Sequence, residues 1–112
     1  MRTEKDSLGT KEIPDDAYYG IQTQRAIENF PISGLKTDPF LIKAYALIKC
    51  AAAQTNSELE LLEKTKARVI MQGAKEIAIG KLRDQFPVDV FQAGAGTSLN
   101  MNLNEVIANR AL

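Results

Sequence analysis

Apolar residues recur at helical spacing along most of the chain, and this pattern predicts its secondary structure. Leu41 and Tyr45 begin a series of apolar residues at steps of three or four, which places them on one face of a helix. Aspartate is a favoured N-cap residue, which suits Asp38. Proline is favoured at the first helical position, which suits Pro39, because the backbone nitrogen there makes no hydrogen bond within the helix. We therefore predict a helix over residues 39–56.

Three further segments carry the same period. Residues 19–29 and 61–79 each place apolar side chains on one face, and we predict a helix in each. Gly80, just after the second segment, predicts a left-handed stop. A last helix is predicted to begin between Thr97 and Asn102. The fold class is therefore mainly α.

Two segments lack the helical period. Residues 1–16 are polar and alternate weakly, which predicts a short hairpin or an extended arm at the start of the chain. Val88, Val90 and Gln92 alternate in the same way, so we expect an extended approach to the glycines that follow. Cys50, the only cysteine, lies in an apolar helical stretch, and we assign it to core packing.

Composition limits the domain organisation and the partners. The chain has 112 residues, of which 45% are hydrophobic, and this suffices for one domain over residues 1–112. Lys and Arg total 14, as do Asp and Glu, so no net field attracts nucleic acid or a membrane surface. No apolar stretch approaches the ~20 residues of a membrane-spanning helix, and the polar start is unlike a secretory signal. We expect a cytoplasmic protein.

The absence of histidine narrows the possible chemistry. Histidine is the usual proton shuttle at neutral pH, the base of Ser-His-Asp triads and the commonest zinc ligand. Calcium loops with alternating Asp and the Gly-Lys-Ser/Thr of phosphate loops are absent as well. We therefore expect neither a metal site nor a mononucleotide site.

Residues 94–105 are the most specific segment, with two glycines, two hydroxyl residues and three asparagines. The glycines allow the backbone to approach a ligand, and the hydroxyl and amide groups can hydrogen-bond a carboxylate without adding charge. Thr97, Ser98 and Asn100 are the candidate binding residues. Local chemistry alone favours a plainer function for the two hydroxyls, as helix caps. Asn102 and Glu105 resemble a capping pair as well.

A pair of glycines at this spacing also occurs in dinucleotide-binding folds. The third glycine of that motif is absent here and helices dominate the chain before it, which disfavours a dinucleotide-binding fold.

Three stretches carry a resemblance to a known family: residues 4–9, 13–30 and 94–105. Together they resemble the start of the aspartate ammonia-lyases, in the aspartase/fumarase superfamily. The superfamily pattern Pro-x-x-x-Tyr-x-Gly-x-Gln-Thr-x-Arg-x-x-x-Asn-Phe is met from Pro14 to Phe30. Fumarate hydratases more often have Trp in place of Tyr19 and Gly-Ser-Gly-Thr-Gln-Ser across the glycine run. Ala95 and Ser98 therefore favour the amine substrate.

The resemblance implies a carbon–nitrogen lyase that converts L-aspartate to fumarate and ammonia without consuming a cofactor. It implies the amino-terminal helical domain of that fold, with Thr97, Ser98 and Asn100 binding the dicarboxylate substrate. The family's base is a serine on a downstream loop, so no catalytic residue is expected within residues 1–112. The family also assembles as a homotetramer through helices that lie beyond Leu112. The last predicted helix is still apolar at Leu112, and we expect an incomplete amino-terminal lyase domain.

Two other functions remain open from the sequence. A fumarate hydratase would use the same dicarboxylate pocket and expel water in place of ammonia. A non-catalytic helical interaction domain would present an apolar face to a partner protein and use the glycine run only as a hinge.

Overall fold

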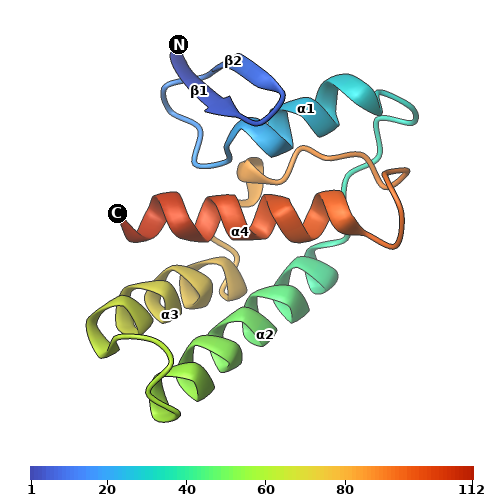
Figure 1. Ribbon diagram of the computed structural model, residues 1–112. Coiled ribbons are helices and arrows are strands. Elements are labelled where there is room, and N and C mark those ends of the chain that lie inside the picture. The colour runs from blue at the N-terminus through green and yellow to red at the C-terminus, as the bar shows by residue number, and fades with distance from the viewer.

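A computed structural model describes all 112 residues of the chain. Its elements in order are β1 (Arg2–Asp6), β2 (Gly9–Ile13), α1 (Ile21–Asn29), α2 (Pro39–Glu58), α3 (Lys64–Ala78), the 3-10 turn η1 (Arg83–Gln85) and α4 (Thr97–Ala111). Figure 1 shows α4 lying across the middle, with the hairpin and α1 on one side and the α2–α3 pair on the other. The prediction of a mainly α fold with a starting hairpin is confirmed.

The hydrophobic core gathers around α4. Leu103 and Val106 of this helix are 0% exposed. With Leu99 and Ile107 of the same helix, they share one cluster with buried residues of the three other helices and of the loop before α4, namely Ala26, Ile42, Ala46, Ala74, Ile77, Phe86 and Val88. Cys50 packs against this cluster, which confirms its assignment to core packing. Burying each large apolar side chain contributes about 1.5–3 kcal/mol. Because α4 supplies more residues to this cluster than any other helix, it contributes much of the stability of the core.

The predicted helices form, with ends shifted by a few residues. The Asp38 carboxylate accepts a hydrogen bond from the Phe40 amide at 2.8 Å, so the predicted N-cap of α2 is confirmed. Gly80 has a φ of +96° directly after α3, as its left-handed stop requires. None of the helices combines the length and the apolar character that a bilayer crossing demands.

The two strands pair antiparallel, from Arg2 opposite Ile13 to Asp6 opposite Gly9. Ile13, at 0% exposure, forms a small second cluster with Ala17 and Ile21 beneath this hairpin. The Arg2 guanidinium donates to the carbonyl oxygens of Pro14, Ala17 and Tyr19 at 2.8–2.9 Å. The same side chain therefore ties the hairpin to the turn that precedes α1.

The predicted capping pair Asn102 and Glu105 is wrong. α4 begins at Thr97, with Gly96 as its N-cap at a φ of +87°. Asn102 is 0% exposed, and its amide donates to the Gln85 carbonyl oxygen at 2.9 Å. The residue is buried because it lies on the face of α4 that packs against the core, and core packing outweighs the local capping pattern.

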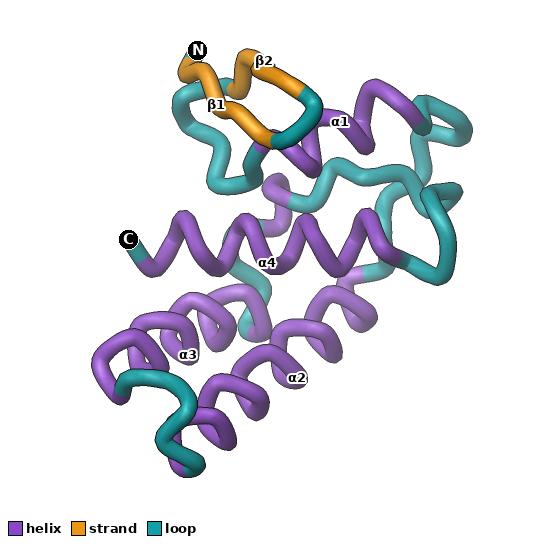
Figure 2. The backbone as a smooth tube through the Cα atoms, in the orientation of Figure 1, coloured by secondary structure: helices purple, strands orange, loops and turns teal.

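The extended approach to the glycines contains no strand. Only an isolated β-bridge forms in it, between Lys36 and Asp89. The Asp89 carboxylate accepts hydrogen bonds from the amides of Ser33, Gly34 and Phe91 at 2.8–2.9 Å. In Figure 2 this loop runs along α4 on the side of α1, next to the linker between α1 and α2. The Asp89 side chain, and not a neighbouring strand, therefore accepts the hydrogen bonds of these backbone amides.

Candidate functional site

The glycine turn before α4 leaves the start of this helix open. Gly94 and Gly96 have φ values of +59° and +87°, which favour glycine, and glycine as N-cap supplies no capping side chain. The Leu99 amide is bound by the Gln92 side chain at 2.7 Å, and the Asn100 amide bonds the Gly96 carbonyl oxygen at 3.1 Å. The amides of Thr97 and Ser98 have no protein acceptor. Two N–H donors therefore remain free at the positive end of the helix dipole.

Thr97 is exposed and its hydroxyl group makes no hydrogen bond within the protein. A Cβ added at Gly94 would lie 3.4 Å from this hydroxyl oxygen, so the turn comes close to it. The only side-chain acceptor for the first-turn amides of α4 is that of Gln92, so the capping function considered for Thr97 and Ser98 is not the one found. The Thr97 hydroxyl and the two free amides belong to the same first turn.

Ser98 faces the opposite way. It is 2% exposed and lines a cavity of about 300 Å³ between α1, the hairpin and α4, together with Arg25 and Asn29. Arg25 does not offer a free charge to this cavity, because its guanidinium binds both oxygens of Asp6 at 2.8–2.9 Å. That hydrogen-bonded pair lowers the pKa of Asp6 below its usual value. Arg25 therefore serves as the ion-pair partner of Asp6.

Asn100 faces α2. Its side-chain oxygen accepts a hydrogen bond from the Lys49 ammonium group at 2.7 Å. The Tyr45 hydroxyl lies nearby, 3.5 Å from the position of a Cβ added at Gly96. Sequence reasoning missed both α2 residues. The available signal was a lysine within the apolar run from Ala44 to Ala53.

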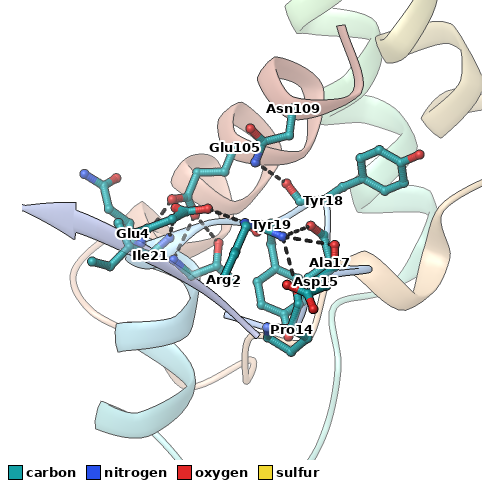
Figure 3. A network of polar contacts seen from close by, with 12 residues as sticks. Arg2, Glu4, Pro14, Asp15, Ala17, Tyr18, Tyr19, Ile21, Glu105 and Asn109 are labelled. Carbon is teal, nitrogen blue, oxygen red and sulfur yellow. Dashed lines mark hydrogen bonds and ion pairs between the residues drawn. The ribbon is translucent and has the colours of Figure 1, made fainter. Parts of the chain in front are cut away.

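A carboxylate network ties the C-terminal half of α4 to the start of α1, as Figure 3 shows. Glu105 accepts hydrogen bonds from the amides of Gln22 and Thr23 at 3.0 and 2.9 Å, and from the Thr23 hydroxyl at 2.6 Å. Glu4 accepts one from the Ile21 amide at 3.0 Å. A Cβ at Gly20 would collide with the Glu105 carboxylate. Glu105 therefore caps α1, and it holds α1 against the helix that carries the candidate site.

The arrangement around the first turn of α4 suits a carboxylate anion. Its groups are a hydroxyl, free backbone amides, a side-chain amide and one ammonium group, and all of these can donate to an oxygen anion. No group of three His, Cys, Asp or Glu side chains lies together as a metal site requires.

The known proteins to which this chain is similar are lyases. A family model described as "Lyase" matches residues 9–112. The chain is 58% identical over 112 residues to an aspartate ammonia-lyase of a Bacillus species, covering 100% of this chain and 24% of that protein. It is 57% identical over 110 residues to a class II fumarate hydratase of Halobacterium salinarum, covering 98% of this chain and 23% of that protein.

Solved structures give the same picture. A fumarate lyase:delta crystallin structure from Brucella melitensis superimposes with a TM-score of 0.97 at 54% identity, covering 100% of this chain and 26% of that one. A class II fumarase from Schistosoma mansoni gives 0.95 at 35% identity, covering 98% and 23%. The chain thus spans about a quarter of the length of its relatives. The chain belongs to the lyase family and, within it, to the aspartase/fumarase superfamily.

Proposed function

We propose that this chain supplies part of the substrate-carboxylate site of an aspartate ammonia-lyase, which converts L-aspartate reversibly to fumarate and ammonia. The observation that carries the proposal is the open first turn of α4, where the Thr97 hydroxyl and two backbone amides are free of protein partners. Such a turn binds a carboxylate through neutral donors and through the helix dipole. In this proposal the substrate-binding residues are Thr97, through its hydroxyl and amide, Ser98, through its backbone amide, and Asn100, through its side chain; the enzyme consumes no cofactor.

The reaction explains why donors are needed there. A base removes a proton from C3 of L-aspartate, and the electron pair passes onto the adjacent carboxylate, which becomes an enolate-like dianion before ammonia leaves. Donors aimed at this second negative charge stabilise the transition state more than the substrate. Removing one such donor typically lowers kcat by about 10²–10³-fold. In this proposal Thr97 is such a donor, while the base belongs to residues beyond this chain.

The proposal includes the whole protein around this site. We infer an incomplete domain over residues 1–112, a cytoplasmic homotetramer when complete, and a small dicarboxylate as its partner. These inferences follow from the resemblance of residues 13–30 and 94–105 to the aspartate ammonia-lyases.

A fumarate hydratase is the second candidate. It is supported by the Halobacterium relative, at 57% identity against 58% for the Bacillus aspartate ammonia-lyase. Tyr19, Ala95 and Ser98 favour the aspartate reaction in the resemblance described above. Both reactions need the same dicarboxylate site and differ in the group that leaves.

The test is an assay of the complete protein with L-aspartate and with L-malate, following fumarate by its ultraviolet absorbance. We expect turnover of L-aspartate, and loss of it in Thr97→Val, which keeps the side-chain shape and removes the hydroxyl. Turnover of L-malate alone would replace the first proposal with the second. Turnover of neither, together with no affinity for fumarate, would refute both and favour a non-catalytic interaction domain.

A further inference from the structure

Lys49 is a half-buried lysine with an unusual partner. It projects from the middle of α2, and its ammonium group donates to the Asn100 side-chain oxygen at 2.7 Å. The ion pairs in the structure are Met1–Asp15, Arg2–Glu4, Lys11–Glu28, Arg25–Asp6 and Arg110–Glu76, and none includes Lys49. A positive charge without a carboxylate partner therefore lies beside the first turn of α4.

The contact determines which end of the Asn100 amide is free. An ammonium group has three donors and no acceptor, so only the oxygen of the amide can face Lys49. The NH₂ group must then point the other way, and it has no protein acceptor in the structure. Asn100 and Thr97 are three residues apart on one helix and so lie on neighbouring positions of its surface. The free NH₂ group and the free Thr97 hydroxyl are thus both donors on this face of α4.

We propose that Lys49 is a positioning residue of the carboxylate site, which rests on the function proposed above. It orients the Asn100 amide so that its NH₂ group, and not its oxygen, meets the substrate carboxylate. Its charge adds to the positive end of α4, where the Thr97 and Ser98 amides are free. Without Lys49 the amide can turn its oxygen toward the carboxylate, and two oxygen acceptors facing each other repel.

A purely structural function for Lys49 would have a different signature. Lys49 also links α2 to α4, so its loss could simply loosen the helix pair. That loss would lower the thermal midpoint and would affect all ligands and kinetic constants together. A positioning function predicts weaker dicarboxylate binding at an unchanged thermal midpoint, and recovery with arginine, which also carries a charge and only donors.

The experiment measures succinate binding to the complete protein by calorimetry, with KM and kcat for L-aspartate and the thermal midpoint. We expect Lys49→Met to weaken succinate binding by at least about tenfold, which corresponds to one weakened charged contact. Lys49→Gln, which can accept as well as donate, should weaken it by about threefold or more, and Lys49→Arg should stay within about threefold of the parent. Lys43→Met is the matched control, because Lys43 is exposed on the same helix.

The outcomes separate this inference from the proposed function. Parent-like succinate affinity in Lys49→Met, or in Lys49→Gln should the Met variant not fold, overturns the inference. So does an equal loss in Lys43→Met, or a failure of Lys49→Arg to recover affinity. If Thr97→Val weakens binding while the Lys49 variants do not, only the function of Lys49 is refuted. If the parent protein itself does not bind succinate, fumarate or L-aspartate, the proposed function fails and this inference with it.

Discussion

Replacing Glu105 should weaken the packing of α1 against α4. The two helices are far apart in the sequence, and the Glu105 side chain joins them. The carboxylate accepts hydrogen bonds from the Gln22 amide, the Thr23 amide and the Thr23 hydroxyl, at 3.0, 2.9 and 2.6 Å. Thr23 is 0% exposed, so water cannot replace the lost acceptor there. Glu105→Ala leaves buried donors without a partner, and this costs more than the bond itself gained.

The expected magnitude follows from these contacts. A hydrogen bond to a charged group contributes about 1.5–3 kcal/mol, but the three bonds share one carboxylate and the Gln22 amide is solvent-accessible. We therefore expect Glu105→Ala to lower the free energy of unfolding by about 2–4 kcal/mol, and Glu105→Gln, which keeps one acceptor oxygen, by about half as much. Urea denaturation followed by circular dichroism measures both.

Two controls make this prediction specific. Asn104→Ala changes the exposed neighbour of Glu105 and should stay within about 0.5 kcal/mol of the parent. Gly20 has an extended backbone with a φ of −121°, so alanine is strained there chiefly by its collision with the Glu105 carboxylate, and less by the Glu4 carboxylate at 3.0 Å. Gly20→Ala should therefore cost clearly less in the Glu105→Ala background than alone. Additive effects, or a parent-like Glu105→Ala, would refute the capping function.

Three further predictions follow from single residues. Hydrogen bonds to the Asp89 carboxylate, led by that of the Phe91 amide, lower its pKa from 3.8 to about 2. The stabilisation by the ionised carboxylate is therefore complete above pH 3.8 and is lost as the pH falls through about 2. Urea titrations at several pH values should show that Asp89→Asn is less stable than the parent near neutral pH, and that its free energy of unfolding changes less across this pH range. Leu103→Ala removes a side chain that is 0% exposed at the centre of the core, and a urea midpoint corresponding to a loss of about 2–5 kcal/mol is expected. Gly80→Ala forces a Cβ into a left-handed conformation at φ +96°, and thermal denaturation should report a loss of about 1–2 kcal/mol.

The sequence predicted elements whose signals are local. Asp38 and Pro39 mark the start of α2 because an N-cap and a first-turn proline act within a few residues. The capping pair in α4 failed for the opposite reason. Glu105 binds the Gln22 amide 83 residues away, and Asn102 is held by Gln85 in the core. Tertiary contacts of this separation cannot be recognised from spacing.

The same distinction holds for the candidate site. Thr97, Ser98 and Asn100 were singled out because hydroxyls and amides follow glycines, and this is a local pattern. Their separate directions depend on which elements cover each side of α4, with Ser98 facing α1 and Asn100 facing α2. Lys49 is 51 residues from Asn100 in the sequence, and the two side chains meet only because α2 packs against α4.

The three carbonyl contacts of Arg2 have a practical consequence for anyone who prepares this protein. A purification tag placed ahead of Met1 leaves them intact and gives up only the exposed ion pair of the terminal ammonium with Asp15. Removing the first two residues, by design or by a contaminating protease, would remove these hydrogen bonds to the turn that leads into α1. A tag should therefore be placed ahead of Met1, and mass spectrometry should confirm that Arg2 is retained.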